Sequence, residues 1–207
     1  MIKLSKVLGF VVGIIGFQSL GFGQSAPSFV NISRISYNGS GCPLGTVNEN
    51  VSTDRQAFTL TFSEYAAEAG PTLALSAQRR NCQVTVDLNF PSGWSYSIVS
   101  IDYRGFAFLD RGVRGTHAAS YYFQGQGQTA RSSTTLRGFF NDSYFVRDVL
   151  GLNAVVWSPC GARRALNINS EVRVDNRFNR NAEGLMTVDS IDGQVIHTYN
   201  LAWRRCS

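Results

Sequence analysis

The sequence has 207 residues, a formal net charge of +5, 43% hydrophobic residues and 16% charged residues. This composition indicates a globular protein and excludes an intrinsically disordered chain, and the length is most simply that of one domain. The small net charge gives no reason to expect binding to nucleic acid.

Residues 1–23 have the layout of a secretory signal peptide. Two lysines precede an uncharged, mostly apolar run over residues 7–20, and small glycines follow at the expected cleavage site. The run is too short for a stable membrane span. We therefore expect residues 24–207 to form a single secreted domain, extracellular or periplasmic, in which every formal cation is an arginine.

Period-two alternation of apolar and polar residues recurs along the chain and predicts half-buried strands. It is found in Phe58–Ser63, Val84–Phe90, Leu166–Asp175 and Val195–Trp203. Turn-forming residues separate such segments. Asp192-Gly193 predicts a hairpin between Met186–Ile191 and Gln194–Trp203.

Convincing helices are scarce. We expect one or two helical turns at Ser63–Ala69 and a similar short helix at Asp142–Leu150. Roughly nine to twelve short strands in one domain predict an all-β fold. The expected architecture is an antiparallel β-sandwich, jelly-roll-like or related, with a closed barrel as the alternative.

The cysteines are Cys42, Cys82, Cys160 and Cys206. An even number of cysteines in an exported protein predicts disulfides, and zinc binding is disfavoured because no CxxC or HxxxH spacing is present. Three pairings are possible. We favour Cys42–Cys82 with Cys160–Cys206, because each pair brackets a continuous block of predicted strands.

Several ordered motifs resemble a known family. Among them are Gly41-Cys-Pro43, Arg79-Arg-Asn-Cys82, Asp102-Tyr-Arg-Gly105, Val156-Trp-Ser-Pro-Cys-Gly161 and Leu166-Asn-Ile-Asn169. Together they resemble the secreted domain-of-unknown-function family numbered 4360, found in bacteria and fungi. The resemblance implies secretion and one cysteine-stapled domain, and it implies no reaction, ligand or catalytic residue.

The two histidines, His117 and His197, do not form a recognisable catalytic set. On an extended strand His117 and Ser120 point to opposite faces, so they cannot act as base and nucleophile together. His197 lies on the apolar face of the last predicted strand and is expected to be a buried, hydrogen-bonded core residue.

The carboxylates suggest an alternative function. The protein would then be a secreted hydrolase or lyase that acts on polysaccharide through an Asp/Glu pair that includes Asp102 or Glu171. Asp102, Tyr103 and Arg104 end a predicted strand and are candidate ligand contacts, although an Asp102–Arg104 pair bracing a turn explains them as well. Asp189–Gly193 and Asp175–Asn179 offer oxygen ligands, but neither segment fits the spacing of an EF-hand. We expect no metal and no cofactor.

Arginine doublets lie next to three of the cysteines: Arg79-Arg80, Arg163-Arg164 and Arg204-Arg205. A Cys160–Cys206 disulfide would bring the last two doublets near one crosslink. Guanidinium groups bind carboxylate, sulfate or phosphate in a bidentate manner, so Arg163, Arg164, Arg204 and Arg205 are candidate ligand-binding residues. The alternative is a dispersed set of surface ion pairs.

Aromatic residues crowd the middle of the chain. Adjacent Tyr121 and Tyr122 must place one ring on each side of a strand, and an exposed row of rings can stack on the apolar faces of sugars. We therefore predict Trp94, Tyr103, Tyr121 and Tyr122 as candidate sugar contacts. The alternative is that these rings fill the interface between the sheets.

These observations favour a secreted, non-catalytic binding or structural module whose ligand is a polysaccharide or a cell-envelope glycan. The alternatives are the hydrolase or lyase described above and a secreted toxin or inhibitor that binds a protein. Nothing in the sequence identifies a protein partner.

Overall fold

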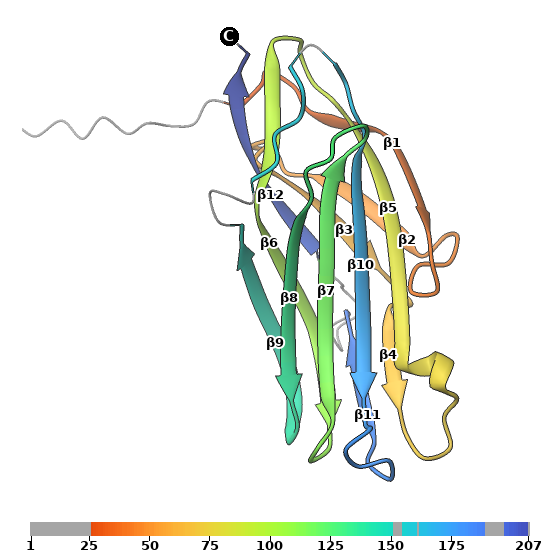
Figure 1. Ribbon diagram of the computed structural model, residues 1–207. Helices are drawn as coiled ribbons and strands as arrows, with labels where there is room; N and C mark the ends of the chain where they lie inside the picture. The colour runs from red at the N-terminus through yellow and green to blue at the C-terminus, as the bar shows by residue number, and fades with distance from the viewer. Residues whose placement is uncertain (1–25, 151–154, 161, 189–196, 207) are drawn as a thin grey trace, which may run out of the picture.

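Strands dominate the structure and form two antiparallel sheets that pack face to face (Figure 1). The computed structural model describes residues 26–150, 155–160, 162–188 and 197–206. The predicted all-β sandwich is therefore confirmed. In this described part, no helix is long and apolar enough to cross a membrane.

Sheet A has five strands, which lie in the order β1 (Asn31–Asn38), β5 (Arg79–Asn89), β10 (Leu166–Asp175), β7 (Arg114–Phe123) and β8 (Ala130–Arg137). Sheet B has seven strands. Six of them follow the order β2 (Val47–Val51), β3 (Ala57–Phe62), β12 (His197–Arg205), β6 (Trp94–Leu109), β11 (Gly184–Thr187) and β4 (Ala66–Ala69), and β9 (Phe140–Val149) also pairs with β6. A short 3₁₀ helix, Leu75–Gln78, precedes β5.

The core lies between the sheets and is built by alternation within each strand. In β10, Ile168, Val172 and Val174 are buried, whereas Asn169 and Glu171 point to the other face. Aromatic rings fill much of the space. Tyr96 of sheet B meets Phe123 of sheet A edge to face, with ring centroids 5.1 Å apart.

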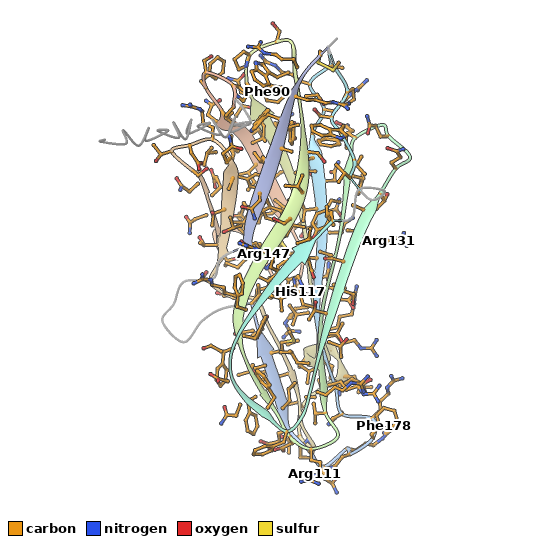
Figure 2. The ribbon with its side chains drawn as sticks, turned by 90° about the vertical axis from the view of Figure 1, so that its left-hand side faces the viewer. Phe90, Arg111, His117, Arg131, Arg147 and Phe178 are labelled. Atoms are coloured by element: carbon orange, nitrogen blue, oxygen red, sulfur yellow. A yellow bond between two sulfur atoms is a disulfide. The ribbon has the colours of Figure 1, made fainter. Side chains whose placement is uncertain are left out.

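Both histidines lie in the middle of this core, as Figure 2 shows for His117. The ring of Tyr103 lies 4.1 Å from that of His117 and 5.0 Å from that of His197. The Nδ1 atom of His197 is 3.3 Å from the hydroxyl of Tyr199. Burial lowers the pKa of His117 to about 4 and that of His197 well below 6.5, so both imidazoles are neutral at neutral pH. The expectation of a buried core histidine at position 197 is confirmed.

The two predicted helices are wrong. Ala66–Ala69 forms β4 and Phe140–Val149 forms β9. In β9 the partly or fully buried Tyr144 and Val146 alternate with the exposed Phe145 and Arg147, which is the period of a strand rather than a helix. β9 pairs with β6 along its whole length, and this pairing satisfies the backbone groups of β9 that face β6.

The prediction that the strands before and after Asp192-Gly193 pair with each other as a hairpin is also wrong. Strands β11 and β12 each pair antiparallel with β6, so they run in the same direction and cannot pair as a hairpin. Gly184 faces Leu109 and His197 faces Tyr103, which places the two strands one after the other along one edge of β6. The turn itself lies outside the described residues.

Two disulfides join Cys42 to Cys82 and Cys160 to Cys206, as predicted. Cys42 lies between β1 of sheet A and β2 of sheet B, and its partner Cys82 is inside β5. Cys160 lies between β9 of sheet B and β10 of sheet A, and its partner directly follows β12. Each disulfide therefore secures a connection that passes from one sheet to the other.

Removal of the Cys42–Cys82 disulfide should lower stability substantially. Its ends are 40 residues apart in sequence, and the chain-entropy model predicts a loss of roughly 4 kcal/mol for a loop of that size. We expect the double variant Cys42→Ser/Cys82→Ser to melt roughly 8–16 °C lower than the parent protein in a calorimetric scan. An unchanged melting temperature would contradict the role given to this crosslink.

The buried histidines should make the protein sensitive to mild acid. Their pKa values are lower in the folded than in the unfolded chain, so below pH 6.5 the unfolded chain binds protons that the folded chain cannot. Between pH 6.5 and about 4, each histidine should reduce the free energy of unfolding by up to about 1.4 kcal/mol per pH unit. Denaturant titrations at several pH values measure this slope.

The variant His117→Phe should have a shallower slope over the same pH range, whatever its absolute stability. A slope equal to that of the parent protein would show that His117 does not contribute to the acid sensitivity.

Candidate functional site

The outer face of sheet A, which we call the polar face, carries polar side chains in cross-strand rows. One row contains Gln83, Asn169, Ser120 and Arg131, on β5, β10, β7 and β8. The adjacent row contains Asn81, Glu171, Ala118 and Ser133 on the same four strands. Successive residues of a strand point to opposite faces, so burial of the neighbouring apolar residues forces these side chains outward.

These two rows line a shallow groove with a volume of about 760 Å³. The groove exists because short side chains, Ala118 and Ser120, occupy its middle on β7, whereas longer amides lie across from them on β5. Amides, hydroxyls and guanidinium groups supply both hydrogen-bond donors and acceptors along its walls.

The two ends of the groove differ in charge. At the β5 end, Arg79 donates to the carboxylate of Glu171 through Nε at 2.6 Å. At the β8 end, Arg131 is exposed and points away from the core (Figure 2). Within the described chain, Glu171 is the one carboxylate of the groove lining.

A second hollow, of about 470 Å³, lies farther along the same face. Arg34 of β1 and Asp87 of β5 form an ion pair at 2.9 Å there, and Arg163 and Arg164 are also part of the lining. Between the two hollows the row of Thr85, Asn167 and Tyr122 crosses the sheet. The hydroxyl of Thr85 donates to Asn167 Oδ1 at 2.9 Å.

The exposed row of aromatic rings predicted from Trp94, Tyr103 and Tyr121 is wrong. All three rings are buried in the core, because their strand positions point between the sheets. The hydroxyls of Tyr103 and Tyr121 are hydrogen-bonded to each other and to Ser132. Tyr122, the next residue after Tyr121, points to the polar face and is the one candidate of this group that reaches a surface.

Asp102 lies on the opposite side of the molecule, on the outer face of sheet B. Arg147 of β9 donates to it through two nitrogens, at 2.6 and 2.7 Å, and this interaction lowers the pKa of the Asp102 carboxyl. The alternative Asp102–Arg104 pair is not formed. Arg104 instead lies 5.2 Å from the ring centre of Phe145. Because Asp102 and Glu171 occupy opposite outer faces, they cannot act together on one substrate.

The arginine doublets that flank the second disulfide do not share a partner. Arg163 and Arg164 line the second hollow of the polar face. The guanidinium of Arg204 lies 4.3 Å from the ring centre of Trp157, and that of Arg205 lies 4.0 Å from the ring centre of Trp94. Arg205 thus covers the buried Trp94 and Arg204 covers Trp157, which accounts for the second doublet in structural terms.

The turn at Asp175–Asn179 is held by its own hydrogen bonds. Arg177 donates to both carboxylate oxygens of Asp175, and the amide of Asn176 donates to the backbone carbonyl of Ala182 at 3.1 Å. Over the residues that the structure describes, no three His, Cys, Asp or Glu side chains gather as a metal site would require. The other proposed oxygen-rich segment, Asp189–Gly193, lies outside the described residues.

The groove residues missed by the sequence analysis are Asn81, Gln83, Ser120, Arg131, Ser133 and Asn169. Their signal was present as the polar half of each alternating strand, which is typical of any solvated face. What the sequence does not contain is the pairing that aligns these positions across β5, β10, β7 and β8.

Comparison with known proteins confirms the resemblance found in the motifs. Residues 28–206 match the sequence model of the family described as Domain of unknown function (DUF4360). An uncharacterized secreted protein of Arthroderma benhamiae is 42% identical over 181 residues, which are 87% of this chain and 74% of the fungal protein.

Solved structures resemble the chain only distantly. The carbohydrate-binding module TmCBM61, in complex with β-1,4-galactotriose, aligns over 84% of this chain and 90% of its own with 8% identity and a TM-score of 0.30. The enzymatically active domain of tailspike protein 4 from bacteriophage CBA120 aligns over 84% of this chain and 20% of its own, with 14% identity and a TM-score of 0.26. Similarities at these TM-scores support no functional assignment.

Proposed function

We propose that this chain, which belongs to the DUF4360 family, is an exported, non-catalytic domain that binds carbohydrate in the groove of its polar face. The observation that supports this proposal is the groove itself, an open hollow of about 760 Å³ walled by amide and hydroxyl groups. Secretion is consistent with the secreted fungal relative.

The groove chemistry suits a polyhydroxylated ligand. Each sugar hydroxyl donates and accepts hydrogen bonds, and the amides of Gln83 and Asn169 and the hydroxyls of Ser120 and Ser133 do the same. These side chains stand on paired strands, so the backbone that carries them is fixed before a ligand binds and little backbone conformational entropy is lost on binding.

The openness of the groove favours a polymer over a small molecule. The groove crosses four strands on an exposed surface, and the second hollow continues beyond Tyr122 and Thr85. A chain of linked sugars can lie across both hollows, with the ring of Tyr122 beside it. Contact with a surface polymer is also compatible with a structural role at a cell envelope.

The carboxylates favour binding over hydrolysis. Glycoside hydrolysis requires two carboxyl groups, roughly 5 to 10 Å apart, on either side of the bond that breaks. In the described groove lining Glu171 stands without a second carboxylate, and Arg79 donates to it at 2.6 Å. The described groove lining thus lacks the pair of carboxyl groups that hydrolysis requires.

Incubation with insoluble polysaccharides and cell-envelope preparations tests the proposal. We expect the protein to pellet with at least one of these materials, and we expect no soluble sugar to appear in the supernatant. Sugar release would replace the binding function with a hydrolase or lyase, whereas neither pelleting nor release would favour a protein partner.

Variants of the groove should weaken this binding. The double variant Gln83→Ala/Asn169→Ala removes two amides and should reduce the affinity by about tenfold, and Ala118→Leu should reduce it by filling the middle of the groove. The matched control is Asn48→Ala/Asn50→Ala, which removes two exposed amides from β2 of sheet B. Equal losses in both double variants would place the binding site elsewhere.

A further inference from the structure

The polar face carries an excess of arginine that the rest of the molecule does not share. Its arginines are Arg34, Arg79, Arg114, Arg131, Arg137, Arg163, Arg164 and Arg173, and its carboxylates are Asp87, Glu171 and Asp175. Over the other residues that the structure describes, nine arginines are balanced by nine carboxylates. The positive charge of the protein is therefore gathered on the face that contains the groove.

Each carboxylate of this face already has a guanidinium partner. Asp87 is paired with Arg34 at 2.9 Å, Glu171 accepts from Arg79 at 2.6 Å, and Asp175 accepts from Arg177 at 2.7 Å. In the described part of the chain, the remaining arginines of the face form no ion pair with a carboxylate. Ion pairing on this face thus involves all three of its carboxylates, and several of its arginines remain without a carboxylate partner among the described residues.

The unpaired arginines lie along both hollows. Arg131 stands at the β8 end of the groove, in the row of Asn169. Arg173 is four residues farther along β10, which is about 13 Å in one direction at the usual rise of a strand. Arg163 and Arg164 lie beside Asp87, which is four residues, again about 13 Å, in the other direction along β5.

We infer that the ligand is an anionic polysaccharide, whose repeated carboxylate or sulfate groups are bound by the unpaired arginines of the polar face. The inference rests on the proposed binding of carbohydrate in the groove and adds the charge of the ligand. One small anion cannot reach guanidinium groups spread over such distances, but a polymer with a negative charge on successive sugars can. Guanidinium forks suit both carboxylate and sulfate.

The same face is less suited to nucleic acid. Proteins that bind single strands stack successive bases on several aromatic side chains. Among the described strands of sheet A, Tyr122 is the one aromatic residue that points outward. The rows of amides and hydroxyls match sugar hydroxyls better than they match a chain of bases and phosphates.

Affinity electrophoresis of the protein, with both disulfides intact, in gels containing soluble polymers tests this inference. Polygalacturonate is compared with its fully methyl-esterified form, and dextran sulfate with dextran, because each pair shares a backbone and differs in charge. We expect at least one charged polymer to bind about tenfold or more tighter than its neutral partner, with an affinity that falls as salt increases. Preference for polygalacturonate identifies carboxylate as the bound group, and preference for dextran sulfate identifies sulfate.

The other outcomes separate the inference from the proposed function. Equal binding to a charged polymer and its neutral partner would overturn the anionic ligand and support carbohydrate binding. No binding to any of these polymers, or to the polysaccharides tested above, would overturn both. Tighter binding to oligothymidylate than to either charged glycan would overturn the inference in favour of nucleic acid.

Two double variants test the site. Arg131→Gln/Arg173→Gln should weaken binding to the preferred charged polymer by about tenfold or more. Arg104→Gln/Arg111→Gln removes the same charge from the outer face of sheet B and from the loop after β6, and should change binding less than about twofold. Equal weakening in both would show attraction to the overall net charge and would contradict a site on the polar face.

Discussion

The antiparallel pairing of β10 with β5 on one side and β7 on the other decides which side chains form the polar face. A shift of one residue in either pairing would turn Asn169 and Glu171 toward the core and Ile168 and Val172 toward solvent. Burial of the apolar residues of β10 therefore stabilises the core and, through the same register, fixes which residues form the proposed binding surface. The groove follows from the same register, because it sets short residues of β7 between Asn169 of β10 on one side and Arg131 of β8 on the other.

The chain passes repeatedly between the two sheets, and the disulfides act at two of these passages. Cys42 secures the segment that leaves sheet A after β1, and Cys160 secures the one that returns to sheet A before β10. Both β1 and β10 contribute to the polar face. The crosslinks thus restrain strands that carry the second hollow and the wall of the groove.

Most aromatic rings are buried in the core, and this limits which interactions the polar face can offer to a ligand. Trp94, Tyr103 and Tyr121 are buried, and Tyr103 packs against two neutral histidines that have no access to water. With Tyr122 as the aromatic residue on the outer face of β7, stacking contributes less than hydrogen bonds and charge. This balance is the physical basis for expecting a hydroxyl-rich, negatively charged ligand and for expecting its affinity to depend on salt.

Alternation in the sequence was sufficient to predict the sandwich, the polar half of β10, the buried His197 and, with the bracketing of strand blocks, both disulfides. The alternation itself is local, because burying one side of a strand depends on residues two positions apart. The partners of each strand are not local. Only the tertiary structure decided that β11 and β12 share one edge of β6, that Asp102 binds Arg147 on the far sheet and that Glu171 binds Arg79. The groove and the excess of arginine on the polar face also depend on the tertiary structure, because they arise where strands from distant parts of the chain align their polar residues.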